Sequence, residues 1–175
     1  MTEIERRIRW YQRPFHEALL GKKHDRLIEI AHRRWGKDEM ALQGLCEIIA
    51  NPNSPKHRIG NYWHCLPEYG QARKAIWEAV NAHTGKRRID EAFPPETRAR
   101  TLNQEMFIEL QNGSTWQCIG SDRYDATVGA GPVFIAYSEW ALANPSAWAY
   151  HRPMREENGG GAAFITTPRG RNHAQ

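Results

Sequence analysis

The chain has 175 residues, of which 40% are apolar, and this supports one hydrophobic core but not two independent ones. No apolar run approaches the roughly 18 residues of a membrane helix, and the N-terminus "MTEIERRIRW" is too charged for a signal peptide, so we expect a soluble intracellular protein. The formal net charge is +4, and basic clusters such as "GKKHDR" and "GKRR" favour a polyanion partner, although such clusters are also typical of solvated surface.

Three cysteines, Cys46, Cys65 and Cys118, are far apart and odd in number, and none belongs to a C-x-x-C motif. This pattern argues against a disulfide framework or a zinc site and predicts buried free thiols. His57 and His64 likewise show no metal-ligand spacing.

Helical spacing marks the start of the chain, where Ile4, Ile8, Tyr11 and Phe15 recur on one face. It predicts an amphipathic helix in the first 20 residues, with Pro14 as the point at which it can break. Residues 26–31, "RLIEIA", then have the composition of a short buried strand.

A second helix is predicted from Asp38 onward, with one apolar face, and it ends at the prolines of "NPNSP" in residues 51–55. The alternation then repeats. Residues 58–66, "RIGNYWHCL", predict a strand, and residues 69–79 predict a helix that Pro67 opens.

Residues 104–120 predict a β-hairpin, because two β-rich runs flank Asn112-Gly113, a dipeptide that suits a type I′ turn. Residues 129–142, "GAGPVFIAYSEWAL", hold a compact apolar strand that ends in Ser-Glu. Asn144-Pro145 begins another helix, and "GGGAAFITTP" supplies a last strand. Strands that alternate with helices, plus one hairpin, predict an α/β fold with a mostly parallel central sheet flanked by helices.

Residues 31–38, "AHRRWGKD", have the position of a phosphate-binding loop between a strand and a helix. In such loops backbone N–H groups at the helix N-terminus point at the anion, and a lysine reaches the outer phosphates. Gly36-Lys37 is retained, but Ala31 replaces the first glycine and Asp38 replaces the usual hydroxyl residue. Because Gly-Lys dipeptides are common, the surrounding sequence has to decide.

Two further segments place polar residues where strands end. "PVFIAYSE" delivers Glu139, a position from which a glutamate can orient an attacking water, although it can equally cap a helix. "FITTPRGRNH" ends in Thr166, Thr167 and Pro168, which lie where ligands bind in open α/β sheets or form an ordinary turn.

In order and spacing, these motifs resemble the ATPase domain of a tailed-phage terminase large subunit, the motor that pumps double-stranded DNA into a capsid. The resemblance runs from "WYQRPFH" through "HRRWGKDEMAL", "GNYWHCLPEYGQARKAIWEAV", "NGSTWQCIGSD" and "VFIAYSEWALANP" to "FITTPRGRNH". It implies a P-loop NTPase of the RecA-like ASCE type that hydrolyses ATP with Mg²⁺. It also implies double-stranded DNA, the portal and the small terminase subunit as partners, a homo-oligomeric ring, and a cytoplasmic location in a bacterial host.

The resemblance assigns roles to single residues. Gln12 corresponds to the adenine contact, Arg33 to the γ-phosphate sensor and Lys37 to the phosphate-binding lysine. Glu139 corresponds to the catalytic glutamate, and Thr166-Thr167-Pro168 to the segment that couples hydrolysis to DNA movement. The rest of the implied nucleotide loop consists of Arg34, Trp35, Gly36 and Asp38.

Three departures from the family pattern accompany the resemblance. Ser138 stands where the family usually has the Mg²⁺-associated aspartate, and Val128-Gly129 replaces an arginine-glycine pair. The chain also stops before the RNase H-type nuclease domain. We therefore interpret residues 1–175 as a single ATPase domain, shortened at its C-terminal end and without the nuclease.

Asp38 and Ser138 together suggest an exchanged ligand pair, with the carboxylate on the loop and the hydroxyl on the strand. Mg²⁺ accepts both, because it prefers oxygen ligands. The opposing interpretation is that Asp38 weakens the site, since a carboxylate beside phosphates costs several kcal/mol at about 4 Å and intermediate dielectric.

The resemblance also implies that DNA is gripped through its backbone without sequence preference, and basic residues suited to this are Arg87, Arg88, Arg98 and Arg100. Two other functions stay open. One is a non-hydrolysing terminase remnant or assembly module that binds nucleotide or DNA. The other is a helicase-like translocase, which shares the adenine-reading glutamine and the phosphate loop.

Overall fold

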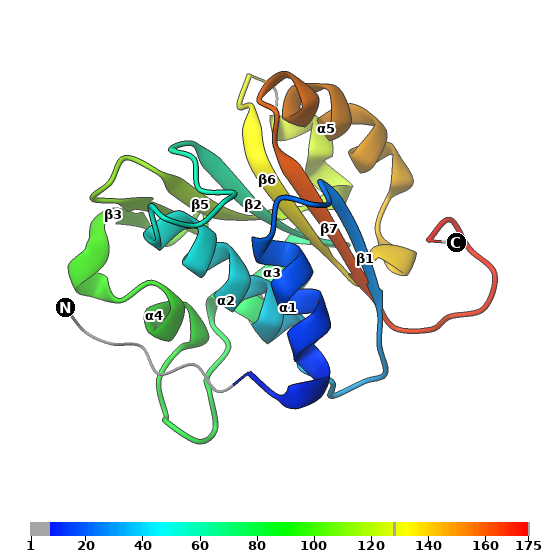
Figure 1. Ribbon diagram of the computed structural model, residues 1–175, viewed down its shortest axis with the longest axis horizontal. Helices are drawn as coiled ribbons and strands as arrows, with labels where there is room; N and C mark the ends of the chain where they lie inside the picture. The colour runs from blue at the N-terminus through cyan, green and yellow to red at the C-terminus, as the bar shows by residue number, and fades with distance from the viewer. Residues whose placement is uncertain (1–7, 128, 175) are drawn as a thin grey trace.

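The computed structural model describes residues 8–127 and 129–174. Its centre is a seven-stranded sheet in the order β1-β7-β6-β2-β5-β4-β3 (Figure 1). Neighbours from β1 to β5 in this order are parallel, whereas β4 is antiparallel to both of its neighbours, β5 and β3. The predicted mostly parallel sheet is therefore confirmed. The strands are β1 Arg26–Ile30, β2 Asn61–Leu66, β3 Arg98–Leu102, β4 Phe107–Leu110, β5 Thr115–Gly120, β6 Pro132–Ser138 and β7 Gly161–Thr166.

Helices cover both faces of the sheet, with α1, α2 and α4 on one side and α5 on the other (Figure 1). None of the helices within the described ranges is long and apolar enough to cross a membrane. The α-helices are α1 Arg13–Leu20, α2 Lys37–Ala50, α3 Tyr69–Ala72, α4 Arg88–Ala92 and α5 Pro145–Glu157, and the other helical turns are η1 Trp10–Gln12, η2 Arg73–Trp77, η3 Pro95–Thr97, η4 Ser121–Thr127 and η5 Trp140–Leu142.

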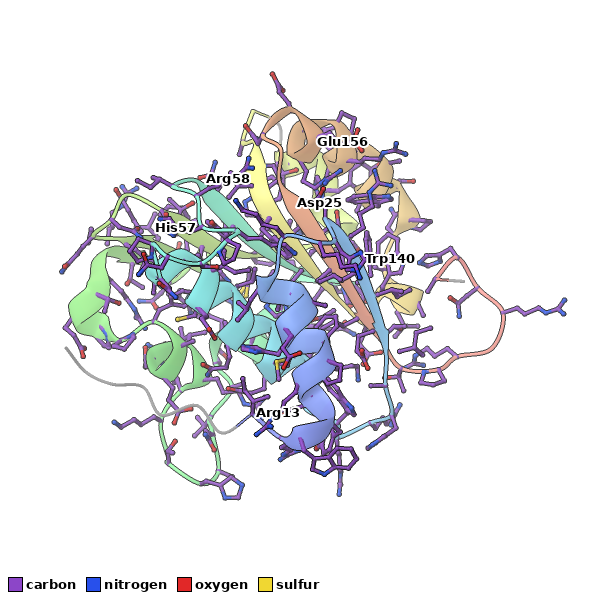
Figure 2. The ribbon with its side chains drawn as sticks, viewed as in Figure 1. Arg13, Asp25, His57, Arg58, Trp140 and Glu156 are labelled. Atoms are coloured by element: carbon purple, nitrogen blue, oxygen red, sulfur yellow. The ribbon has the colours of Figure 1, made fainter. Side chains whose placement is uncertain are left out.

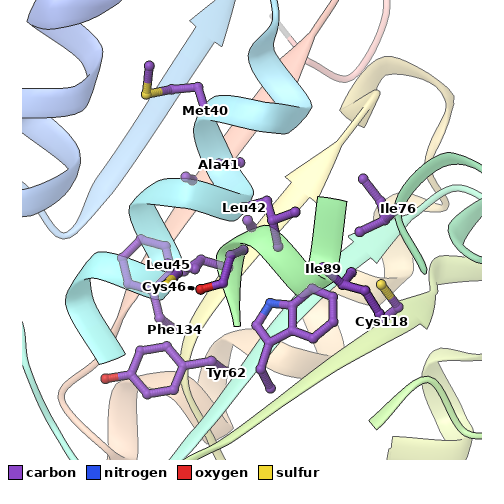
Figure 3. Close-up of a cluster of buried hydrophobic side chains, with 14 of the residues drawn as sticks. Met40, Ala41, Leu42, Leu45, Cys46, Tyr62, Ile76, Ile89, Cys118 and Phe134 are labelled. Carbon is purple, nitrogen blue, oxygen red and sulfur yellow. Dashed lines mark hydrogen bonds between the residues drawn. The ribbon is translucent and has the colours of Figure 1, made fainter. Parts of the chain in front are cut away.

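Alternation along the central strands divides the core between these two faces. Tyr62 of β2 and Phe134 of β6 pack beneath Leu45 of α2 (Figure 3). Trp63 of β2 and Tyr137 of β6 belong to the cluster on the α5 side. Burying each of these side chains contributes roughly 1.5–3 kcal/mol. The central strands are therefore apolar on both faces, as buried parallel strands require.

The N-terminal helix begins later than the spacing predicts. Among the described residues, a 3₁₀ turn at Trp10–Gln12 leads into α1, which starts at Arg13. Pro14 lies in the first helical turn, where its missing N–H has no intrahelical partner, so it opens the helix rather than breaking it. Ile4 lies outside the described residues.

β1 is an edge strand, so the prediction of a buried strand was wrong. It pairs with β7 on one side only, and Ile28 and Ile30 are 52% and 53% exposed. Arg26 of β1 donates to Glu156 of α5 over 2.6 Å, which ties the start of this edge strand to the helix. An apolar composition does not reveal how many neighbours a strand has.

The predicted hairpin is confirmed as β4 and β5, but its turn is not type I′. Among its loop residues only Gly113 has a positive φ, 87°, whereas type I′ requires two such residues. Asn112 instead uses its side chain, accepting from Ser114 N over 2.9 Å and donating to Ile49 O over 3.0 Å at the end of α2. The additional strand β3 was not predicted.

The helix predicted over residues 69–79 is shorter and mixed. α3 passes directly into the π-helical turn Arg73–Trp77, and the chain then pairs Val80 with Arg87 in an isolated bridge. The other local predictions agree better. α2 and α5 occur where predicted, and Asn144 caps α5 by accepting from Ser146 N over 3.0 Å. All three cysteines are buried, and none of them forms a disulfide among the described residues.

A buried histidine network joins α5 to the sheet. His151 of α5 bonds the Tyr137 hydroxyl of β6 over 2.9 Å and the Thr127 hydroxyl over 3.0 Å. Burial lowers the pKa of His151 to about 4, against an opposing hydrogen bond with the backbone of Tyr124. The imidazole is therefore neutral in the folded protein at neutral pH.

We predict that His151 makes the protein less stable as pH falls from about 6.5 to 4. In this window the unfolded state binds a proton that the folded state does not, so the free energy of unfolding drops by up to about 1.4 kcal/mol per pH unit. His151→Gln should flatten the slope measured by urea denaturation, whereas His83→Gln in an exposed loop should not. An unchanged slope in His151→Gln would contradict the prediction.

Candidate nucleotide-binding site

The candidate site lies where β1, β6 and β7 end. Parallel strands bring their carboxyl ends to one edge of the sheet, and polar groups from these ends therefore meet. Residues 31–36 leave β1 and lead into α2, with Ala31 N held by Thr166 O of β7 over 3.0 Å. Glu156 and Asp25 lie at the opposite ends of the strands (Figure 2).

The loop is shaped by two left-handed residues, Arg34 with φ 66° and Gly36 with φ 86°. Between them Trp35 turns into the core and packs 5.6 Å from the ring of Tyr11. Arg33 and Arg34 are left exposed above the loop, where they can approach an anion. This conformation directs the first turn of α2, with its free N–H groups, toward the same space.

Gln12 is buried against this loop. Its Nε2 donates to Trp35 O over 2.9 Å, and its Oε1 accepts from Arg9 N over 3.1 Å. A Cβ atom at Gly36 would lie only 3.0 Å from Gln12 Nε2, so glycine is needed both for the backbone angle and for this close approach. Gln12 and the loop, 23 residues apart, thus form one unit.

Lys37 and Glu139 form the central contact of the site. Lys37 is the first residue of α2, and its Nζ lies 3.0 Å from Glu139 Oε1, with side chains 7% and 25% exposed. Thr167 Oγ1 donates to the same carboxylate oxygen over 2.9 Å, and Arg169 Nε lies 3.9 Å from the other. The predicted loop, strand and coupling segments therefore meet at one carboxylate.

Glu139 is ionised and held in an unusual backbone conformation. Burial alone would raise its pKa, but hydrogen bonds from Lys37 and Thr167 and the charges of Lys37 and Arg169 outweigh burial, so the pKa lies below its usual range. Its φ of 50° is left-handed, and its side chain makes no capping bond to the turn Trp140–Leu142. The alternative of a helix-capping glutamate is therefore not what the geometry shows.

Ser138 and Asp38 have different surroundings. Ser138 is fully buried, and its Oγ lies 2.7 Å from Nε2 of His64, which projects from the neighbouring strand β2. Asp38 Oδ1 is buried and has no hydrogen-bond partner among the described residues. Burial lowers the pKa of His64 to about 4, against the opposing charge of Asp38, so the imidazole is neutral.

Asp38 and Ser138 could supply only some of the oxygen ligands that a magnesium ion needs. Mg²⁺ prefers oxygen and usually keeps waters and phosphate oxygens beside one or two protein groups. The unpartnered Asp38 oxygen and the Ser138 hydroxyl are of this kind. Within the described part of the chain, no group of three or more His, Cys, Asp and Glu side chains is arranged to hold a metal.

The remaining predicted coupling residues flank the central contact. Thr166 is buried, and its Oγ1 accepts from Ala141 N over 3.2 Å. Pro168 follows in the segment that contains Arg169. Val128, the departure from the arginine-glycine pattern, lies outside the described residues.

The four arginines assigned to DNA all have acidic neighbours, and Arg88 contacts Glu39 in the first turn of α2. The side chain of Arg98 is 6% exposed and donates to Asp90 over 2.6 Å and to the carbonyls of Phe93 and Ile89. It supports α4 and is not exposed enough to contact DNA. The more exposed three also form ion pairs, which are Arg87 with Asp90, Arg88 with Glu39 and Arg100 with Glu109.

Two residues of the site were missed by the sequence interpretation. His64 was considered only as an isolated metal ligand, although a polar residue in an otherwise apolar strand is the signal that could have drawn attention to it. Arg169 stands inside the quoted motif "FITTPRGRNH" without an assigned role.

Solved structures share the fold of this chain. A variant of the Thermus phage P74-26 large terminase ATPase domain superposes with a TM-score of 0.70 at 22% identity, covering 96% of this chain and 68% of that one. The bacteriophage HK97 large terminase gives 0.64 at 14%, with coverages of 97% and 35%. A large terminase from a thermophilic bacteriophage, in complex with ADP, gives 0.63 at 15%, with coverages of 89% and 38%.

The chain has the fold of a phage terminase ATPase domain. No family model matches the sequence, and no curated protein matches it. The chain spans about two thirds of the P74-26 ATPase domains and little more than a third of the HK97 terminase and the ADP-bound terminase. The terminase fold thus agrees with the resemblance drawn from the motifs, which the structure brings to one edge of the sheet.

We predict a coupling free energy on the order of 1 to 2 kcal/mol between Lys37 and Glu139, because breaking a mostly buried charged hydrogen bond leaves a charge uncompensated. A double-mutant cycle with Lys37→Met, Glu139→Gln and the double variant, followed by urea denaturation, measures it. The exposed pair Arg100 and Glu109 serves as control and should couple more weakly. Strictly additive losses at Lys37 and Glu139 would refute the prediction.

Proposed function

We propose that this chain is the ATP-binding and ATP-hydrolysing motor domain of a phage DNA-packaging terminase large subunit. The observation that carries the proposal is the 3.0 Å contact between Lys37, at the start of a helix after a strand-loop turn, and Glu139, at the end of a neighbouring strand. A phosphate-binding cation and a water-orienting carboxylate are the two protein groups that phosphoryl transfer to water most needs.

In the proposed complex the ATP phosphates lie at the N-terminus of α2, where backbone N–H groups and Lys37 bind them. Arg33 is exposed on the loop, and the proposed adenine contact is Gln12, whose amide bonds the backbone of Trp35. Lys37 then exchanges part of its contact with Glu139 for phosphate, which leaves the carboxylate available to orient water. Because its pKa is low, Glu139 stays ionised during this exchange.

Asp38 and Ser138 are the proposed magnesium ligands. Bound there, Mg²⁺ would neutralise charge on the β- and γ-phosphates. Asp38 would contribute the carboxylate and Ser138 the hydroxyl, which reverses the arrangement expected from the family. The buried, unpartnered oxygen of Asp38 supports this assignment, because an ionised carboxylate oxygen without a donor is costly unless a cation or donor reaches it.

Double-stranded DNA, the portal and the small terminase subunit are the proposed partners of the motor, within a homo-oligomeric ring. DNA contact is proposed through phosphates rather than bases, with Arg87, Arg88 and Arg100 as candidate residues. Each of the three already has an acidic neighbour, so their net attraction for DNA is reduced.

Two alternatives are distinguished by turnover. A remnant or assembly module would bind nucleotide or DNA without hydrolysis, and the position of Asp38 beside the phosphates favours this alternative over the helicase. A helicase-like translocase would hydrolyse ATP and also separate strands. Assays of ATP hydrolysis with and without double-stranded DNA, together with a strand-separation assay, therefore discriminate among the three.

We predict that the protein hydrolyses ATP and that double-stranded DNA stimulates the reaction. Lys37→Ala should abolish nucleotide binding. Glu139→Gln should retain binding but lower kcat by about a hundredfold or more, because the group that orients water has lost its charge. Binding is measured by calorimetry and turnover by phosphate release.

Lys86→Ala and Glu157→Gln are matched exposed controls and should behave as the unmodified protein does. Nucleotide binding without any turnover, equal in the unmodified protein and Glu139→Gln, would favour the non-hydrolysing module. Strand separation would favour the helicase.

The exchanged-ligand assignment makes a separate prediction. Asp38→Thr leaves two hydroxyls and Ser138→Asp places two carboxylates beside the phosphates, so each should lower Mg²⁺-dependent turnover by about tenfold or more. The double variant restores one ligand of each kind and should recover much of the activity. Asp125→Thr, at an exposed position, is the control. Independent, multiplicative losses in the double variant would exclude the exchange.

A further inference from the structure

His64 and Ser138 form a buried polar pair inside the sheet. His64 lies on β2 opposite Ala136 of β6, and Ser138 stands two residues farther along β6 on the same face. Both side chains are completely buried, and Nε2 of the imidazole lies 2.7 Å from Oγ of the serine. A polar pair at this depth persists only if its hydrogen bond is satisfied.

The ring of His64 is held in place from other strands. Its neighbour on β5 in register is Cys118, and the Trp116 ring meets it edge-on with centroids 6.4 Å apart and an interplanar angle of 86°. Among the described residues Nδ1 has no hydrogen-bond partner, and the same is true of Oδ1 of Asp38. Ser138 is thus the one hydrogen-bond partner that the described structure gives this imidazole.

The direction of this bond decides what Ser138 can offer. A serine hydroxyl has one proton and two lone pairs, and a neutral imidazole has one donor and one acceptor nitrogen. If Nε2 accepts, the hydroxyl proton points into the ring and both oxygen lone pairs are available. If Nε2 donates, one lone pair is used and the hydroxyl proton is free to point at a cation, which repels it.

We propose that His64 is a positioning residue that accepts the Ser138 hydroxyl proton at Nε2 and thereby presents the serine oxygen to the magnesium ion of the nucleotide complex. This inference rests on the proposed function, because it concerns the cation of that same site. His64 itself touches neither cation nor phosphate in this arrangement. It acts through Ser138, as an outer partner acts on a metal ligand.

A hydroxyl oriented in this way compensates for the missing strand carboxylate. A bare serine hydroxyl rotates, and its proton then points toward the cation in part of the population. The accepting imidazole removes these rotamers and polarises the O–H bond, which increases the negative charge on the oxygen. The pair of Ser138 and His64 therefore offers more than serine alone, without adding a second formal charge beside Asp38.

The test compares two amides of different reach. The amide of His64→Gln ends near the former Nε2 and can still accept from Ser138, whereas the shorter His64→Asn ends near the former Nδ1 and cannot. Affinity for ATPγS is measured by calorimetry with and without Mg²⁺ for the unmodified chain, both amides, Ser138→Ala and His64→Asn/Ser138→Ala. Urea denaturation verifies that each variant folds.

The expected readout is the gain in affinity that Mg²⁺ produces. His64→Asn should reduce this gain by about tenfold and leave the Mg²⁺-free affinity unchanged, and His64→Gln should restore most of it. In the Ser138→Ala background His64→Asn should have no further effect. A loss in Mg²⁺-free affinity, an equal loss in both backgrounds, or equal behaviour of Asn and Gln would overturn the proposal.

Two outcomes separate this inference from the proposed function. If the unmodified chain binds no ATPγS at all, the proposed function fails and the inference falls with it. If Mg²⁺-dependent binding is normal but Ser138→Ala leaves the gain unchanged, the role of Ser138 and this inference are overturned while the nucleotide site stands. Should His64→Asn fail to fold, His64→Gln alone decides. Its amide can still accept from Ser138, so a loss of the Mg²⁺ gain as large as that of Ser138→Ala would overturn the proposal.

Discussion

The contact between Lys37 and Glu139 is the constraint on which the arrangement of this edge depends. An ammonium group as buried as that of Lys37 is costly unless an anion faces it. The anion comes from the end of β6, and it is held in turn by Thr167 from the end of β7. One charge requirement therefore joins a loop, a helix and two strands that lie far apart in the sequence. In the proposed function, a bound phosphate would take the place of part of the Glu139 contact.

Local chemistry explains which elements were predictable. The Asn144 side chain caps α5 and Pro145 is its first residue, so the start of this helix is visible in the local sequence. The apolar runs of β2 and β6 reflect burial on both faces. The edge position of β1 and the presence of β3 were not predictable in this way. Both depend on which strands lie next to each other, and pairing between distant segments leaves little trace in a short window.

The residues of the candidate site also fall into those that local motifs predict and those that depend on the order of the strands. The loop and Glu139 could be predicted from the sequence because the carboxyl ends of parallel strands meet at one edge of the sheet. Motifs found separately at the ends of different strands therefore predict one common location. The hydrogen bond between His64 and Ser138 could not be predicted from the sequence, because it requires β2 and β6 to be neighbours. Nor does composition separate His64 from His151, which is equally buried but joins a helix to the opposite face.

The exposed edge of β1 affects the stability of the loop that follows it. A strand with a single bonded neighbour opens more easily than the central strands, because fewer hydrogen bonds and apolar contacts oppose its departure. This strand is also the one that leads into the loop of residues 31–36. Fraying of the sheet edge and loss of the ordered loop are thus coupled events, and any anion that binds the loop in its folded form holds the edge closed by mass action. One edge of the sheet is thereby made sensitive to what binds the loop.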